Sequence, residues 1–242
     1  MKDYILQSQI EHKKWKKEIR KKVSIIDRIT SSSQKKFNSL LPEKYHEIVT
    51  SAVKNMVKSV LFGYQYITKE PYKNLSLKER EDIARNKIDY YRKSARIEGV
   101  ATGAAGLLVG LADFPLLLGI KVKLLYDLAA IYGFDVRDYK ERLYILYIIQ
   151  LSFSSRNYGK KIFDIMENWD EYSENLPNDI NNFDWKSFQQ EYRDYLDLAK
   201  LLQLVPGIGA AVGFYVNGKL LNKLGETAIN SYRMRLELFK KI

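Results

Sequence analysis

The sequence predicts an all-α protein, and three observations support this fold class. Apolar side chains recur at helical spacing in several segments, as expected of helices with one buried face. Proline is scarce, with 5 residues in 242, so few helices are interrupted. Hydrophobic residues make up 46% of the chain, which is enough for a packed core. We expect a compact multi-helix domain with two glycine-rich apolar helical hairpin segments.

A strongly basic stretch lies near the N-terminus. Trp15, Ile19, Val23 and Ile26 recur at helical spacing within and after it, which predicts a basic amphipathic helix. Such a helix either lies on an anionic membrane surface or docks its apolar stripe on the rest of the fold. Residues 30–33 have the composition of a linker, so we expect a basic helical arm at 1–33 and a helical domain at 34–242. The candidate lipid-contacting residues of the arm are Lys13, Lys14, Lys16, Lys17, Arg20, Lys21 and Lys22.

Two helices are expected after the linker. Pro42 suits the first turn of a helix, where its missing N–H group costs nothing, and an apolar stripe continues from there to Leu61. This helix should end before Pro71. Ser76 and Glu79 have the spacing of a capping box, which predicts the start of a second, long helix.

The first glycine-rich segment spans residues 99–120. Small residues at four-residue spacing leave a helix face without side chains, so another backbone can approach closely. Pro115 forbids a continuous helix, so we expect helices at 99–112 and 115–132, with Asp113 capping the second and Gly133 ending it. The glycines concerned are Gly99, Gly103, Gly106 and Gly110.

The second half of the chain opens with an apolar helix. Asp138 and Glu141 predict its start, and it should run to about Ser152. Residues 163–184 form an acidic stretch with a loop at 175–178. This stretch either binds a basic partner, including the chain's own basic helix, or is simply solvated. Helix is expected again at 185–204.

A second glycine-rich segment spans residues 205–218. Like the first, it is suited to helix packing or membrane contact. A final basic helix is expected to reach Ile242, with Arg233 and Arg235 attracting anionic lipid together with the N-terminal arm. The residues that define the second segment are Pro206, Gly207, Gly209 and Gly213.

Taken in order, these segments resemble the EcsC protein family. The likeness rests on residues 99–110 followed by 113–115, on 128–135 followed by 142–143, and on 204–213 with Asn217, Ala228, Arg233 and Arg235. It spans about residues 45–240. The resemblance implies an all-helical EcsC-like domain, encoded in some bacteria beside an ABC exporter with EcsA-like and EcsB-like subunits. It transfers no catalytic residue to this sequence.

Several kinds of chemistry find no support in the residues. The chain has no cysteine, which excludes thiolate metal sites and thiol catalysis, and its two histidines, His12 and His46, do not stand at metal-ligand spacing. The glycine runs lack the Gly-Lys-Ser/Thr ending of a phosphate loop, and no nucleophile elbow is present. We therefore expect no metal and no cofactor. Glu98 and Asp113 form a candidate polar site beside the first glycine-rich segment, although a structural role for both is favoured.

The partners expected from the sequence are anionic. The formal net charge is +11, which attracts nucleic acid, anionic lipid or an acidic protein. No named DNA-binding motif is visible, so we do not expect a nucleic-acid partner. Residues 99–120 are long enough to cross a bilayer, but Asp113 and Pro115 favour an interfacial or re-entrant hairpin, or a buried one.

These observations lead to two functional hypotheses. The N-terminus lacks the apolar stretch of a signal peptide, so we expect a cytoplasmic protein, peripheral on the inner face of the cell membrane. The first hypothesis is a non-catalytic accessory or regulatory protein there, bound to anionic lipid or to ABC exporter subunits. The alternative is a carrier or enzyme for lipid-like molecules, with a pocket between the glycine-rich helices.

Overall fold

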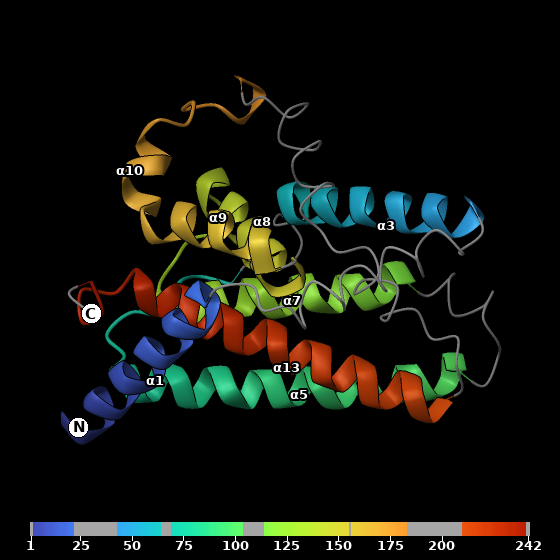
Figure 1. The fold of residues 1–242 in the computed structure, drawn as a ribbon, viewed down its shortest axis with the longest axis horizontal. Helices are drawn as coiled ribbons and strands as arrows, with labels where there is room; N and C mark the ends of the chain where they lie inside the picture. Colours follow the sequence, from blue (N-terminus) through green and yellow to red (C-terminus); the bar gives the residue numbers. More distant parts are fainter. Residues whose placement is uncertain are drawn as a thin grey trace.

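The computed structural model describes residues 2–21, 43–63, 69–103, 114–154, 156–182 and 210–240 (Figure 1). Within these ranges the regular structure is helical and contains no strand, which confirms the all-α prediction. The glycine-rich hairpins are not confirmed, because most of their residues lie outside the described ranges. The elements are α1 (Lys2–Arg20), α3 (Glu43–Phe62), α5 (Leu77–Gly103), α7 (Phe114–Tyr132), α8 (Tyr139–Phe153), α9 (Arg156–Glu167), α10 (Trp169–Glu174), the 3-10 turn η1 (Ile180–Asn182) and α13 (Ala210–Met234).

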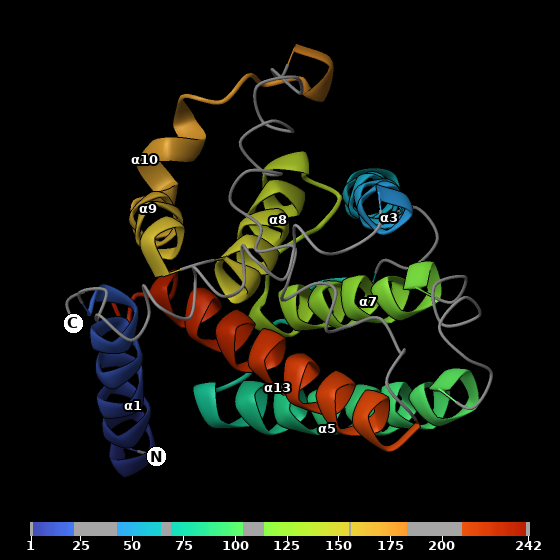
Figure 2. The same ribbon diagram turned by 45° about the vertical axis from the view of Figure 1, so that its right-hand side comes forward.

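An antiparallel pair of long helices, α5 and α13, forms one side of the fold (Figures 1 and 2). Gly225 of α13 lies directly against Ile88 of α5, where a Cβ atom on the glycine would stand 2.6 Å from the isoleucine Cδ1. On the exposed side, Arg85 Nη1 lies 2.9 Å from Glu226 Oε1. These contacts fix the register of the pair. The C-terminal end of α5 therefore lies beside the start of α13. The first of these ends carries residues 99–103 of the first glycine-rich segment, and the second carries residues 210–218 of the second segment.

The core is centred on α7 and α8. Every residue from Leu124 to Tyr132 is buried, and so is every residue from Arg142 to Phe153. A helix that is covered on all sides belongs in the interior, which confirms the prediction of a strongly apolar helix after Asp138. The flanking helix α3 covers α7 and α8, while α5 and α13 pack on α7.

Several of the predicted helix ends are confirmed. Ser76 and Glu79 form the capping box, with the Ser76 N–H donating to Glu79 Oε2 at 2.8 Å and the Glu79 N–H donating to Ser76 Oγ at 3.4 Å. Asp138 accepts from the Lys140 N–H at 2.9 Å at the start of α8. Gly133 follows α7 at a φ of +93°, a conformation that favours glycine. Pro115 lies in the first turn of α7.

The prediction of a basic helix reaching Ile242 is wrong. Helix α13 ends at Met234, and residues 235–240 form turns in which the Arg235 N–H donates to the Tyr232 carbonyl and the Phe239 N–H to the Leu236 carbonyl. Tertiary contacts explain the early end. Arg235 turns toward Glu141, and Phe239 packs against His12 of α1. In the acidic stretch, the loop predicted at residues 175–178 is confirmed, because α10 ends at Glu174 and the loop begins at Asn175.

None of the helices in the described part of the chain combines the length and the apolar character that crossing a bilayer requires.

Candidate functional site

The N-terminal helix α1 docks on the start of α5 and the end of α13 through a buried polar junction. At its centre, Arg233 of α13 donates two hydrogen bonds to Glu81 of α5, from Nε to Oε1 at 2.7 Å and from Nη2 to Oε2 at 2.6 Å. Glu81 is 0% exposed and Arg233 1% exposed. Burial by itself lowers the pKa of Arg233, but the hydrogen bonds and charge of Glu81 outweigh it, so this pKa is raised. Arg233 therefore keeps its positive charge inside the protein.

Helix α1 adds its own groups to this pair. The Tyr4 hydroxyl donates to Glu81 Oε2 at 2.8 Å, and Arg233 reaches the Ser8 carbonyl and Glu11 at 3.4 Å each. Burial and the adjacent Glu81 carboxylate raise the pKa of Tyr4 to about 12, so its phenol keeps its proton. Glu81 of α5 therefore accepts hydrogen bonds from both α1 and α13.

His12 is the most buried side chain of α1. Its Nδ1 lies 3.1 Å from Asn230 Oδ1, while the Asn230 amide group donates to the Glu226 carbonyl. Since that Asn230 oxygen can only accept, Nδ1 carries the imidazole proton and Nε2 is a buried acceptor with no hydrogen-bond donor among the described residues. Burial lowers the pKa of His12 to about 4. The ring stacks on Trp15 and meets Phe239 edge-on.

A second, partly exposed contact fixes the other end of α1. Lys16 Nζ lies 2.7 Å from Glu167 Oε1 at the end of α9, and Arg20 pairs with the same carboxylate. Arg20 also lies over the Phe163 ring, which meets Trp15 edge-on. The acidic stretch therefore contacts the chain's own basic helix through Glu167, one of the two alternatives that the sequence left open.

A second, partly buried ion pair lies just beyond α13. Arg235 donates to Glu141 of α8 through Nη1 at 2.5 Å and Nη2 at 2.7 Å, and its guanidinium lies 3.9 Å from the centre of the Phe134 ring. Phe134 in turn stacks on Tyr232, within a cluster that includes Tyr132 and Tyr144. Arg233 and Arg235 were expected to attract lipid from a basic helix. Both side chains instead bind acidic partners: Arg233 is buried against Glu81, and Arg235 is partly buried against Glu141.

Two further buried polar side chains, Asp127 and Arg142, stabilise the helices outside the α1 junction. Asp127 of α7, which is buried, accepts from the Tyr91 hydroxyl at 3.0 Å and pairs with Lys87 at 3.1 Å. Arg142, within the family-like residues 142–143, donates to the carbonyls of Val136 and Arg137 at 2.8 and 2.7 Å. These contacts hold the helices and the α7–α8 loop in place.

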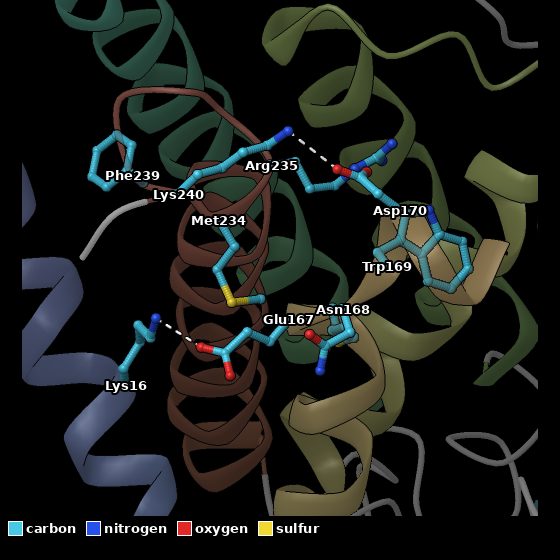
Figure 3. Close-up of a pocket in the computed structure, with 10 residues that line it drawn as sticks. Lys16, Glu167, Asn168, Trp169, Asp170, Met234, Arg235, Phe239 and Lys240 are labelled. Atoms are coloured by element: carbon cyan, nitrogen blue, oxygen red, sulfur yellow. Dashed lines mark hydrogen bonds and ion pairs between the residues drawn. The ribbon is translucent and has the colours of Figure 1, made fainter. Parts of the chain in front are cut away.

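A cleft of about 310 Å³ opens where α1, the α9–α10 junction and the turn after α13 meet (Figure 3). Met166, Trp169, Met234 and Phe239 give it apolar walls. All five charged side chains that line it have partners: Lys16 pairs with Glu167, Lys240 with Asp170 at 3.2 Å, and Arg235 with Glu141. Because the charges cancel locally, the cleft offers no excess charge to a phosphate or carboxylate ligand. Its volume is near the lower end for ligand pockets.

The described residues hold no group of three or more histidine and acidic side chains that could bind a metal ion. The buried titratable groups of the junction bind one another, which fixes how the helices dock. The contacts of His12 recorded among the described residues are with the Asn230 amide and two aromatic rings, which fix the orientation of its ring. This arrangement suits the positioning of α1.

The structure separates the predicted site residues into two groups. Gly99 and Gly103 lie at the end of α5, Gly213 near the start of α13 and Pro115 at the start of α7. The Glu98 backbone is in α5, but its side chain is outside the described part. The following lie outside the described residues altogether: Gly106, Gly110, Asp113, Pro206, Gly207, Gly209 and Lys22.

The candidate lipid-contacting residues lie at the other end of the α5–α13 pair. Lys13, Lys14 and Lys17 are exposed, while Lys16 and Arg20 bind Glu167, and Lys21 pairs with Glu18 at 2.5 Å. The sequence analysis missed Glu81, the centre of the junction. A signal for it exists, because Glu81 shares a helix face with Ala84, Ile88 and Tyr91, where an acidic side chain is out of place unless it has a partner.

The comparisons with known proteins agree on one family. The model of the EcsC protein family matches residues 7–236. This chain belongs to the EcsC protein family. It is 46% identical over 223 residues to Protein EcsC of Bacillus subtilis (strain 168), covering 92% of each chain. It is also 27% identical over 237 residues to the Uncharacterized protein YdbA of the same organism, covering 91% of this chain and 85% of the relative. No solved structure matches it.

Proposed function

We propose that this EcsC family protein is a non-catalytic accessory or regulatory protein at the cytoplasmic face of the membrane, linked to an ABC exporter system. The observation that carries the proposal is the exposed basic surface of α1, held on the body by a built-in polar junction. Lys13, Lys14 and Lys17 are exposed there, in a chain of net charge +11. Basic residues near an anionic membrane contribute about 1 kcal/mol each to binding.

The exporter part of the proposal rests on the family. Family resemblance implies a gene beside an ABC exporter, and an accessory subunit would need a surface and no catalytic centre of its own. The buried charges of the junction are consistent with that, because Arg233 and Glu81 bind one another. Affinity capture from detergent-solubilised membranes, with α1 intact and with residues 2–21 deleted, tests whether exporter subunits are retained.

Two candidate contact regions lie at opposite ends of the α5–α13 pair. The basic helix α1 touches the start of α5 and the end of α13, whereas the parts of the glycine-rich segments that belong to α5 and α13 lie at the other end of the pair (Figure 1). A helix of 25 residues, such as α13, is about 37 Å long. A flat bilayer meets both regions only if the helix pair lies parallel to the surface, so a test must distinguish them.

Flotation with neutral and with anionic vesicles, each at low and high salt, makes that distinction. Charge-driven contact through α1 predicts binding to anionic vesicles that high salt reverses. Binding that survives high salt would point to insertion of the glycine-rich segments. Absence of flotation under every condition would refute direct lipid contact and leave the exporter as the partner.

The carrier alternative has no structural observation in its favour. It requires a pocket between the glycine-rich helices, and that region lies mostly outside the described residues. The cleft within the described part of the chain lies at the α1 end, and its charges are already paired.

A further inference from the structure

Helix α1 has two opposite faces with different roles. At 100° per residue, Ser8, His12, Trp15 and Ile19 fall within about 60° of one another around the helix. Ser8 and His12 are buried, and Trp15 and Ile19 pack against the hydrophobic core. This docked face therefore uses the apolar stripe that the sequence analysis had also considered for membrane contact.

The outward face of α1 carries a different set: Leu6, Ile10, Lys13 and Lys17. These four also fall within about 60° of one another, on the opposite side of the helix. Leu6 is 58% exposed and Ile10 55% exposed, and both lysines are exposed. Leu238, another exposed apolar residue, lies in the turns after α13. Its backbone carbonyl accepts a hydrogen bond from the Gln9 side chain of α1. Two large, exposed apolar side chains thus lie next to two exposed lysines on the same helix face.

This combination matches the chemistry of an anionic lipid surface. Apolar side chains on an interfacial helix enter the boundary between headgroups and acyl chains, while flanking lysines reach the phosphates. Contacts with nucleic-acid phosphates would use the lysines and leave Leu6 and Ile10 in water. The helix also lies at an outer edge of the molecule in both views (Figures 1 and 2).

We propose that the outward face, Leu6–Ile10–Lys13–Lys17, is the surface through which this protein contacts an anionic bilayer while α1 stays docked. The inference rests on the proposed function and specifies the residues that carry it. The contacts of Tyr4 with Glu81, His12 with Asn230 and Lys16 with Glu167 hold α1 in place. Lys16 and Arg20 then serve docking and leave lipid binding to the outward lysines.

The test measures partition of the full chain onto vesicles of phosphatidylcholine with phosphatidylglycerol. Leu6→Ser with Ile10→Ser removes the two apolar side chains of the outward face, and Lys13→Gln with Lys17→Gln removes its two positive charges. Each double variant should weaken partition at least about tenfold. All four side chains are exposed, so the fold should persist, as circular dichroism can verify.

Matched controls lie on α3 and at its end. Lys54→Gln with Lys58→Gln makes the same charge change at the same helical spacing on another exposed surface, and Phe62→Ser removes an exposed apolar side chain. Both should leave partition within about twofold of the unmodified protein. If the unmodified protein binds but the α1 variants behave like these controls, the outward face is the wrong surface and the proposed function stands. If the unmodified protein binds no vesicle, the outward-face proposal and direct lipid contact both fail, and only the exporter link of the proposed function is left.

A second comparison tests whether α1 stays docked. Glu167→Gln removes the partner of Lys16 and Arg20, whereas Asp164→Asn makes the same charge change one turn away on an exposed residue of α9. Equal partition of the two variants supports docked binding. A several-fold larger gain for Glu167→Gln would show that released Lys16 and Arg20 contact lipid, and would overturn that part of the proposal.

Discussion

Replacing Gly225 by alanine tests the close approach of α5 and α13 on which the α1 junction depends. In most helices this change is stabilising, because alanine favours the helix over glycine by up to about 1 kcal/mol. At Gly225 the new Cβ would lie 2.6, 2.7 and 3.1 Å from Cδ1, Cγ1 and Cγ2 of Ile88. The structure therefore predicts the opposite sign.

The magnitude follows from how little Ile88 can yield. Rotation about χ2 moves only Cδ1, and a β-branched side chain in a helix has one strongly preferred χ1. The two γ carbons therefore stay in place unless the helices separate, and Ile88 is 5% exposed within the core. Overpacking of this kind costs about 1–3 kcal/mol. After subtraction of a helix preference of about 1 kcal/mol, the free energy of unfolding should fall by up to about 2 kcal/mol.

Urea denaturation followed by circular dichroism measures this change. The matched control is Gly119→Ala in α7, where a Cβ would meet no atom within 4 Å. That variant should be as stable as the unmodified protein or up to about 1 kcal/mol more stable. In thermal unfolding, Gly225→Ala should lower the midpoint by about 2–4 °C per kcal/mol.

A Gly225→Ala protein at least as stable as the unmodified one would refute the reasoning. Ile88→Val provides a further check, because it removes the nearest atom, Cδ1. Alone, this change should cost about 0.5–1.5 kcal/mol. In the Gly225→Ala background it should cost less, since it relieves part of the overlap.

Two further predictions concern the junction. Glu81→Gln leaves the buried Arg233 with the longer, 3.4 Å contact to the half-exposed Glu11, and it should lower the free energy of unfolding by about 3–5 kcal/mol. Asp82→Asn, which disturbs only the exposed pair with Lys78, should cost less than about 1 kcal/mol, and equal denaturation midpoints for the two variants would contradict this account. His12 binds its proton more weakly in the folded state, with a pKa of about 4 against 6.5. The neutral His12 therefore makes its full contribution to the free energy of unfolding above pH 6.5. As the pH falls from 6.5 toward 4, the free energy of unfolding decreases by up to about 3 kcal/mol. His12→Phe should flatten the pH dependence of stability between pH 6.5 and 5, and an unchanged slope would count against it.

Much of the secondary structure could be predicted because its signals are local. The capping box at Ser76 and Glu79, the cap at Asp138 and the glycine at position 133 each act within a few residues. Each was confirmed at the expected place. The apolar character of residues 143–149 likewise predicted an apolar helix, and the structure shows that this helix is buried on all sides.

The end of the last helix could not be predicted in this way. No proline or glycine follows Met234, and residues 235–242 are compatible with helix by composition. The helix ends because Arg235 and Phe239 find partners on α8 and α1, far away in the sequence. A local pattern carries no information about such contacts.

By itself, the sequence determined the fold class, the position of several helix ends and the basic character of α1. Only the tertiary structure decided which charges are buried and which are presented. Glu81 and Arg233 are 152 residues apart, yet they meet in the interior, whereas Lys13 and Lys17 of the same basic protein face solvent. The physical reason is that burial of a charge depends on which helices pack together, and the register of α5 against α13 is set by packing at Gly225 and not by any local preference.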